Sequence, residues 1–95
     1  LAEKYRITSN RESGFGRYDV VMEPLKENLD AIVMEFKVQN MKKEKSLEQT
    51  VENALRQIDE KEYDIELLAR GIKKERIRHY GFAFRGKEVL IGTEE

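Results

Sequence analysis

The segment from Ala31 to Gln39 constrains the fold more than any other part of this sequence. Its β-branched and aromatic residues are typical of a strand, and Ile32-Val33-Met34 is apolar at successive positions, so both faces of that strand are apolar. A strand of this kind belongs in the centre of a sheet. Glu35 and Lys37 nevertheless follow on one face, and charges on a central strand are costly unless they are paired or bound to a metal.

A second strand precedes this one. Arg17 to Glu23 alternates with a period of two, which separates two faces: Tyr18, Val20 and Met22 on one, and Asp19, Val21 and Glu23 on the other. Pro24 ends the run and a polar turn follows, so the two strands are expected to pair as a hairpin, with both in the centre of the sheet. Upstream, residues 4–8 are expected to be extended and residues 9–16 to form a loop, because Ser, Asn and Gly favour turns.

An amphipathic helix is expected from Ser46 to about Lys61. Ser46 is suited to be the N-cap, and Gln49 stands three positions on to complete a capping box. The apolar residues that follow recur at helical spacing, which predicts one face packed on the sheet: Leu47, Val51, Ala54, Leu55 and Ile58. Asp64 is expected to cap a short second helix, which Gly71 closes.

Two more strands complete the pattern, over residues 76–84 and 87–91, with Arg85-Gly86 as a tight hairpin between them. The order is strand, strand, strand, helix, short helix, strand, strand. This order predicts a mixed α/β class, with a central sheet of about four to five strands and a helix that crosses over it.

The length of 95 residues leaves room for a single domain. Charged and hydrophobic residues each make up 39%, enough apolar residues to exclude a disordered tail. No apolar run is long enough to span a bilayer, so we expect a soluble, cytoplasmic protein that does not bind membranes. The chain begins at Leu1, within a segment that already looks structured, and we expect residues 1–95 to be the C-terminal fragment of a longer protein.

The sequence also limits the metal chemistry. The absence of cysteine excludes disulfides, thiolate nucleophiles and cysteine-based zinc sites, and a single histidine excludes His-rich clusters. Any metal is therefore expected to be held by oxygen ligands. His79 itself is expected to be a structural residue of a strand, with a role as general base as the alternative.

The net charge of -1 does not by itself indicate a polyanionic partner. The charges are unevenly distributed, however, because the segment from Ser46 to Glu66 is acidic and the last third is basic through Arg70, Lys73, Lys74, Arg76, Arg78, Arg85 and Lys87. Such a basic region could contact phosphates, and a solvated face that balances the acidic helix is the alternative.

Asp19, Glu35 and Lys37 are the strongest candidates for chemistry. Residues i and i+2 of a strand share a face and lie roughly 6.5 to 7 Å apart, so Glu35 and Lys37 address one volume, and the hairpin brings Asp19 beside them. Two carboxylates with a backbone carbonyl such as that of Phe36 suit Mg²⁺ or Mn²⁺, and a lysine can assist an attacking water at phosphorus. The alternative is an ordinary solvent-exposed face of an antiparallel sheet.

The arrangement resembles the PD-(D/E)xK nuclease superfamily. Gly16-Arg17-Tyr18-Asp19 in one strand is followed by Glu35-Phe36-Lys37 in the next and by Gln57 in the helix. The closer similarity is to the branch at the carboxyl end of bacterial proteins with an AAA-ATPase-like amino-terminal domain. It is carried over nearly the whole chain by the blocks Asn10 to Asp19, Ala54 to Ile58 and Tyr80 to Phe84.

The resemblance implies a restriction-endonuclease-like core and a metal-dependent nuclease that cleaves DNA or RNA. Asp19 and Glu35 correspond to the acidic metal ligands and Lys37 to the catalytic lysine. Gln57 corresponds to a helix residue that some members point at the site, and a solvent-facing glutamine is the alternative. Arg11 and Arg17 beside the site, with Lys73 and Lys74 in the basic region, are the candidate contacts to nucleic acid, and the alternative for the two arginines is that they are simply solvated.

Two departures from the superfamily pattern accompany the resemblance. Members usually carry an acidic residue on a helix before the first strand, whereas only Leu1-Ala2-Glu3 stands there, so the first core helix is expected to be truncated. Tyr18 replaces the proline before the acid. The competing function is therefore a catalytically idle module that binds nucleic acid or regulates an attached AAA-ATPase-like domain. A homodimer is a further candidate partner arrangement, and an interaction domain with a coincidental Glu-x-Lys is the third hypothesis.

Overall fold

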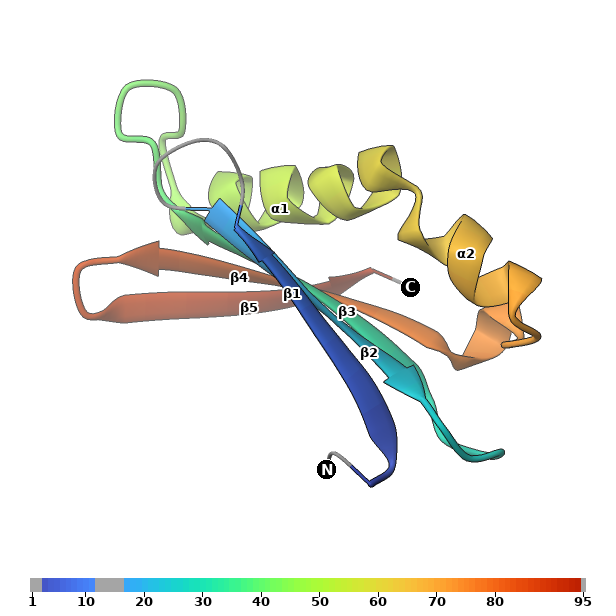
Figure 1. Cartoon of the computed structure of the whole chain (residues 1–95). Helices are drawn as coiled ribbons and strands as arrows, with labels where there is room; N and C mark the ends of the chain where they lie inside the picture. Colours follow the sequence, from blue (N-terminus) through green and yellow to red (C-terminus); the bar gives the residue numbers. More distant parts are fainter. Residues whose placement is uncertain (1–2, 12–16, 95) are drawn as a thin grey trace.

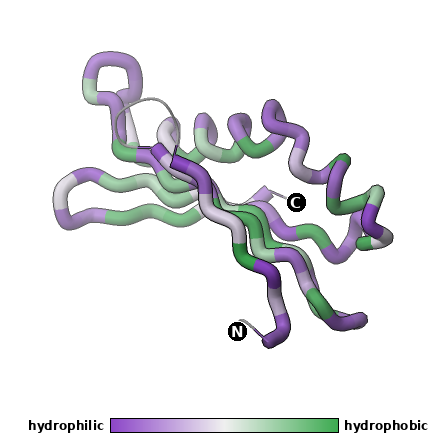
Figure 2. Tube along the Cα trace, viewed as in Figure 1, coloured by the Kyte–Doolittle hydropathy of each residue, from purple (hydrophilic) through white to green (hydrophobic). Residues whose placement is uncertain are grey.

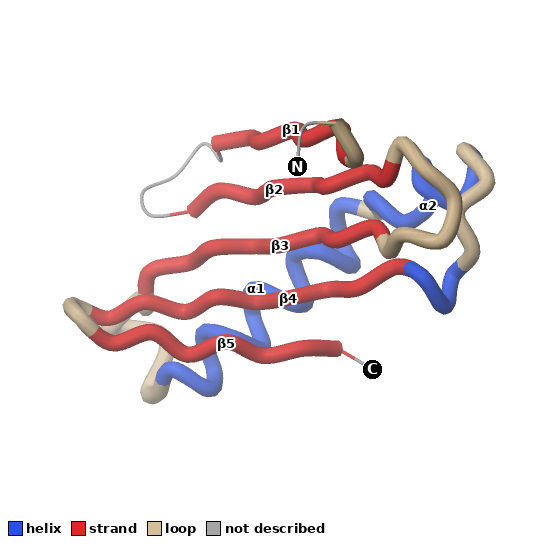
Figure 3. Tube along the Cα trace, turned by 90° about the horizontal axis from the view of Figure 1, so that it is seen from below, coloured by secondary structure: helices blue, strands red, loops and turns tan. Residues whose placement is uncertain are grey.

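A computed structural model describes residues 3–11 and 17–94, which form a five-stranded sheet with helices on one face (Figures 1 and 3). The strand order follows the chain, with antiparallel neighbours except for the parallel third and fourth strands. The elements are β1 (Tyr5–Arg11), β2 (Arg17–Pro24), β3 (Ala31–Val38), α1 (Leu47–Lys61), α2 (Tyr63–Ala69), a short 3₁₀ turn η1 (Lys74–Arg76), β4 (Ile77–Arg85) and β5 (Glu88–Glu94). The predicted mixed α/β class with a crossover helix is confirmed.

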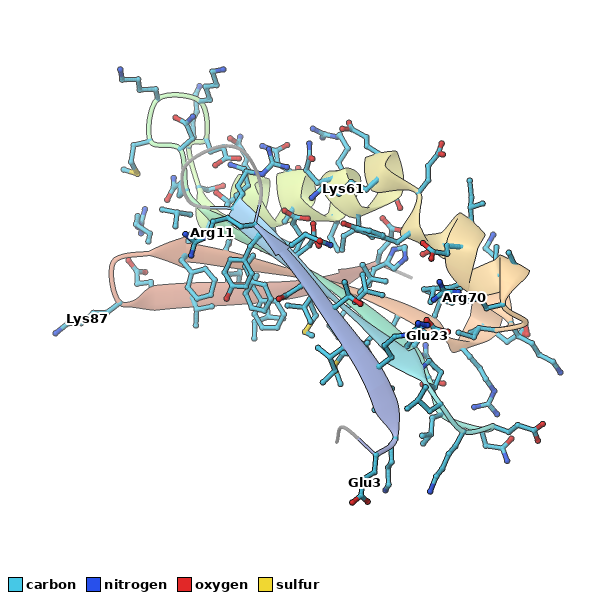
Figure 4. All side chains as sticks on the ribbon, viewed as in Figure 1. Glu3, Arg11, Glu23, Lys61, Arg70 and Lys87 are labelled. Atoms are coloured by element: carbon cyan, nitrogen blue, oxygen red, sulfur yellow. The ribbon has the colours of Figure 1, made fainter. Side chains whose placement is uncertain are left out.

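The parallel step between β3 and β4 determines where the helices lie. Parallel neighbours need a long crossover, and here it consists of α1, α2 and η1, which return the chain across the sheet. Both α-helices lie on the same face, and Figure 3, seen from below, shows the other face in front of them. Arg70, just after α2, pairs with Glu23 of β2 and ties this end of the crossover to the sheet (Figure 4).

The boundaries of α1 follow from its caps. The Ser46 Oγ accepts a hydrogen bond from the backbone N–H of Gln49 at 3.2 Å, and the Gln49 side chain accepts one from the Lys45 N–H at 2.8 Å. The first bond satisfies a donor that the first helical turn leaves unpaired, and the second ties the residue before the cap to the helix. The helix ends at Lys61 because Glu62 adopts a left-handed conformation, with φ of 56°. The predicted N-cap and helix end are confirmed.

The core lies between α1 and the covered face of the sheet. Ala31 and Val33 of β3 are fully buried there, against Ile58 of α1 and Leu67 of α2. Further along the sheet, Gly81 of β4 and Gly92 of β5 are directly opposite one another beneath α1. A Cβ on Gly81 would lie 3.1 Å from the Val51 carbonyl oxygen, so the absence of side chains lets the helix approach the sheet closely.

The opposite face of the sheet carries an aromatic stack. The rings of Tyr18 and Phe36 stack at 4.6 Å, and those of Phe36 and Phe82 at 4.5 Å. Figure 2 shows hydrophobic residues concentrated along the strands, whereas the loop between β3 and α1 is mostly hydrophilic. Because alternate strand residues point to opposite faces, this stack fixes which residues of β2 and β3 face the helices.

Several boundaries differ from the prediction. β1 continues to Arg11, because residues 9–11 pair with β2, and β5 continues to Glu94 because it pairs with β4 along its whole length. The loop expected over residues 9–16 is wrong for residues 9–11, and its remainder, residues 12–16, lies outside the described residues. Asp64 does not cap α2; Glu62 occupies that position without a side-chain cap. Gly71 follows α2 with φ of 95°, as the predicted helix end requires. In the described ranges, neither helix is long and apolar enough to cross a bilayer.

We expect Gly92→Ala to destabilise the fold by about 1–3 kcal/mol, because overpacking displaces stiff neighbours. The new Cβ would lie 2.4 Å from the Cγ1 of Val51, a branched side chain with little freedom to move. Urea unfolding monitored by circular dichroism measures the effect. Thr93→Ala, at an exposed position of the same strand, is the control and should change stability little. Equal stability of both variants would contradict this packing argument.

Candidate active site

Asp19 and Glu35 form a buried pair of carboxylates. They are direct partners in the register between β2 and β3, and both point to the face covered by the helices, where each has 0% exposure. The alternative of a solvent-exposed sheet face is therefore wrong for these residues. Two like charges buried side by side repel one another, so the pair requires compensating positive charge.

Lys61 supplies that charge from the last turn of α1. Its Nζ lies 2.7 Å from Asp19 Oδ2 and 3.1 Å from Glu35 Oε1, so one ammonium bridges the two carboxylates. Figure 4 labels Lys61 at the end of the helix, above the sheet. Asp19 also accepts hydrogen bonds from Asn10 Nδ2 at 3.1 Å and from the Tyr63 hydroxyl. Burial, and then this bond to Asp19, raise the pKa of Tyr63 to about 12, so its hydroxyl stays a donor.

Glu35 retains an unused ligand atom. Burial is the largest influence on the pKa of Glu35 and raises it, and the charge of Asp19 acts in the same direction. Lys61 and Arg17 lower the pKa, but the net result is a pKa above the usual value. Within the described residues its Oε2 accepts no hydrogen bond, and the Arg17 Nε lies 3.8 Å from it. A buried carboxylate oxygen without a donor, beside a second carboxylate, offers hard ligands that fit Mg²⁺ or Mn²⁺.

Lys37 lies on the same face of β3 but its ammonium is directed to Glu44. The Nζ to Oε2 distance is 2.6 Å, and the Glu44 side chain is only 2% exposed. Glu44 also accepts hydrogen bonds from Asn53 Nδ2 at 2.6 Å, from the Asn40 N–H at 2.7 Å and from the Thr50 hydroxyl at 3.0 Å. The loop after β3 and the first half of α1 thus hold the carboxylate that fixes Lys37.

The surroundings of Glu44 lower its pKa. Burial alone is the largest single influence and raises the pKa, but the hydrogen bonds from Lys37, Asn53, Asn40 and Thr50 together outweigh it and bring the pKa from 4.5 to about 2. Glu44 is therefore ionised at neutral pH and forms a lasting ion pair with Lys37.

A cleft of about 640 Å³ opens beside the acid pair. Its charged lining is mainly basic, with Arg17, Lys37, Lys43 and Arg56 against Glu44 and Glu60. Arg17 connects the cleft with the acid pair, because it lines the cleft and its guanidinium lies near Glu35. Its Nε and Nη2 are buried and, within the described residues, make no hydrogen bond. Guanidinium donors without acceptors are suited to phosphate oxygens.

The other residues singled out from the sequence are scattered. Gln57 lines the cleft and donates a hydrogen bond to Glu60 Oε2 at 3.2 Å, and its part in the site stays a prediction. Arg11 is exposed at the end of β1 (Figure 4). Lys73 and Lys74 are exposed just before β4, and Lys73 lines a different pocket. The Phe36 ring lies on the aromatic face, and the ligand role of its carbonyl stays a prediction.

Sequence reasoning missed Lys61 and Glu44. Lys61 stands one helical turn beyond Gln57, so the helical period could have placed it near the site. The apolar stripe of α1 does not indicate this contact, because the long side chain of a lysine can carry its ammonium several ångströms from the helix position at which it stands. Glu44 was hidden among the lysines of the loop at 41–45, whose fold determines which lysine it meets.

We expect the stability of the protein to fall at acidic pH through Glu44. Because its folded pKa of about 2 lies below the usual 4.5, its stabilisation is complete above pH 4.5 and is lost as the pH falls towards 2. The two pKa values correspond to about 3 kcal/mol, of which about 2 kcal/mol is lost by pH 3. Glu44→Gln should be less stable than wild type at pH 7, and the gap should narrow between pH 5 and pH 3 in urea titrations.

The control for this measurement is Glu52→Gln, at an exposed position of α1. Its unfolding free energy should follow that of the wild type at every pH. A gap between wild type and Glu44→Gln that stays constant with pH would show that the Glu44 carboxylate is not the titrating group.

Comparison with known proteins supplies one match. The model of the PD-(D/E)XK nuclease superfamily matches residues 1–94. No curated protein and no solved structure matches the chain. The family match covers almost the entire sequence, including the strands that carry Asp19 and Glu35 and the helix that carries Lys61. The mixed sheet with its crossover helix and the matched family agree, and the chain belongs to the PD-(D/E)XK nuclease superfamily.

Proposed function

We propose that this protein hydrolyses phosphodiester bonds of DNA or RNA at the Asp19–Glu35 pair, with Mg²⁺ or Mn²⁺ as cofactor. The observation that carries the proposal is the buried pair itself, in which Glu35 Oε2 lacks a hydrogen-bond donor beside a basic cleft. Membership of a nuclease superfamily supports the same chemistry. If the two carboxylates served only as partners of Lys61, a basic cleft beside them with unsatisfied guanidinium donors on Arg17 would have no role.

Each residue has a distinct part in the proposed reaction. Asp19 and Glu35 would hold the divalent cation, and the chemistry supplied there would be polarisation of the phosphoryl oxygen and acidification of an attacking water. Arg17 binds a non-bridging phosphate oxygen through its unsatisfied N–H groups and orients the phosphate against Glu35. Lys37 stabilises the negative charge that grows on the phosphoryl oxygens, and Glu44 holds its ammonium at the cleft. Lys61 offsets part of the negative charge of the two acids when no divalent cation is bound.

The cleft also suggests which surface holds the nucleic acid. Lys43 and Arg56 line it together with Lys37 and Glu44. Lys43 and Glu44 belong to the lysine-rich loop at 41–45, which projects between β3 and α1 (Figure 1). We propose that Arg17, Lys43 and Arg56 follow the phosphate backbone. Lys73 and Lys74 lie before β4 and line no part of this cleft, so their contribution would be smaller. Such contacts make binding weaker as salt rises.

Asp19→Asn and Glu35→Gln should each abolish cleavage, because both remove a charged oxygen ligand of the metal. Lys37→Ala should reduce the rate by about 10²-fold or more while leaving metal affinity unchanged, since it acts on the charge of the transition state. The measurement is the cleavage of plasmid DNA and of a structured RNA with Mn²⁺ and with Mg²⁺. Glu52→Gln serves as the control. Full activity of Asp19→Asn would refute the proposed site.

One observation favours the idle module as a second candidate. The Lys61 ammonium bridges both carboxylates, Lys37 is paired with Glu44, and Arg17 Nε lies 3.8 Å from Glu35, so three cations face three carboxylates without a metal. An idle protein would bind nucleic acid, or an attached ATPase-like domain, without turnover in either metal. Filter binding of the same DNA and RNA separates the two: retention without cleavage, unaffected by Asp19→Asn, favours the idle module.

Lys61→Met should bind Mn²⁺ more tightly than the wild type, because the ammonium competes with the metal for the same two carboxylates. Without metal the variant should be less stable by about 3–5 kcal/mol, the usual effect of removing one partner from a buried ion pair. Saturating Mn²⁺ should therefore raise the melting temperature of the variant more than that of the wild type. Calorimetric titration and thermal unfolding measure both effects. Weaker Mn²⁺ binding than in the wild type would make Lys61 part of the metal site rather than its competitor.

A further inference from the structure

A second group of ionisable side chains gathers around β4 and β5, whereas Asp19 and Glu35 lie on β2 and β3. Its centre is His79 of β4, whose side chain is only 9% exposed. Asp59 of α1 and Glu94 of β5 face the same edge of its ring, and Asp64 of α2 faces the opposite edge. Four elements therefore contribute to one cluster, which has no part in the proposed phosphodiester chemistry.

The hydrogen bond to Asp64 orients the histidine. The Nε2 lies 2.7 Å from Asp64 Oδ1, and since an ionised carboxylate only accepts, this contact places a proton on Nε2. In the neutral imidazole the lone pair is then on Nδ1, which lies 3.2 Å from Glu94 Oε1 and 3.8 Å from Asp59 Oδ1. A carboxylate that holds one ring nitrogen of a histidine while the other faces further ligands is the usual support of a metal-bound histidine.

The facing atoms of Asp59, His79 and Glu94 are all potential ligands. One atom from each lies within 4.8 Å of the others, a spacing at which a single ion can bind all three. Three acceptors that face one another are unfavourable unless a cation lies between them. Partial burial, and then the neighbouring Asp59, raise the pKa of Glu94, as such crowding requires. A proton satisfies the cluster in the absence of metal.

We propose that Asp59, His79 and Glu94 form a second cation site, which takes a transition-metal dication of the zinc type and fastens the end of β5 to the end of α1. One imidazole nitrogen with two carboxylates is a mixed ligand set that suits Zn²⁺ or Co²⁺, whereas the all-oxygen pair at Asp19 and Glu35 suits Mg²⁺ or Mn²⁺. Three protein ligands leave a fourth position for water. The two sites therefore differ in the metals they select.

Titration with Zn²⁺ and with Co²⁺ alone, followed by calorimetry and by the visible absorption of Co²⁺, tests this site. The protein is the double variant Asp19→Asn/Glu35→Gln, which removes the first site. The same titration on the wild type in excess Mg²⁺ makes the result independent of whether the double variant folds. We expect one equivalent of Zn²⁺ to bind in both cases, and the chemical shifts of the His79 ring in NMR spectra to change on addition.

Substitutions in the cluster identify the ligands. Glu94→Gln and Asp59→Asn replace partly exposed side chains. Each should reduce the affinity for Zn²⁺ by about tenfold or more. Asp64→Asn should reduce it by about 10–100-fold through the orientation of His79. Glu88→Gln, exposed on β5, should leave it unchanged. Zn²⁺ affinity that is equal in Glu94→Gln, Asp59→Asn and their parent, or no saturable binding up to millimolar Zn²⁺, would overturn the proposal.

Discussion

The burial of two carboxylates directly opposite one another is the constraint on which the rest of this structure depends. Asp19 and Glu35 are paired by the register of β2 and β3, so neither can move away from the other without a slip of the sheet. The helix that covers them therefore has to end in a cation, and it ends at Lys61. Tyr63 and Asn10 supply further hydrogen bonds to Asp19, from α2 and β1. Elements that precede and follow the β2–β3 hairpin in the sequence thus contact one pair of charges.

Two glutamates in this protein show how surroundings decide the protonation of the same chemical group. Glu35 is buried beside a like charge and keeps one oxygen without a donor, and its pKa is raised. Glu44 is also buried, but its oxygens receive four hydrogen bonds, including one from Lys37, and its pKa falls to about 2. The first is suited to accept a cation from solution. The second is already satisfied and serves to hold a lysine.

The sequence predicts the fold well where local rules decide. The period-two pattern of residues 17–23, the apolar run before Glu35 and the Ser46 cap each indicate an element that the structure contains. The pattern predicts that β1 and β5 end earlier than they do, because their last residues are mostly polar. Only pairing with a neighbouring strand makes those residues extended. Aspartate is a common N-cap residue, but Asp64 contacts His79 instead, because α2 begins earlier, with Glu62 at the N-cap position.

The site is harder to predict than the fold for a related reason. Spacing within one strand places Glu35 and Lys37 on one face, and the hairpin adds Asp19. Spacing does not say which carboxylate a flexible lysine contacts. Lys37 is expected beside Asp19 and Glu35, but it pairs with Glu44, and Lys61 contacts the two acids instead. Likewise, a count of one histidine argues against clusters rich in histidine, but it does not exclude a single histidine that gathers acids from three other elements.

The parallel contact between β3 and β4 also affects how the chain can fold. β1, β2 and β3 are joined by short connections, as are β4 and β5, so each group can form from local contacts, while their junction must wait for closure of the whole crossover. Asp19 and Glu35 belong to the first group and Lys61 to the crossover. The two acids consequently meet while they are still hydrated, and water leaves them only when the helix arrives with its ammonium. Closure of α1 over the sheet is then a desolvation step as well as a packing step, and its rate should depend on the ions in the solution.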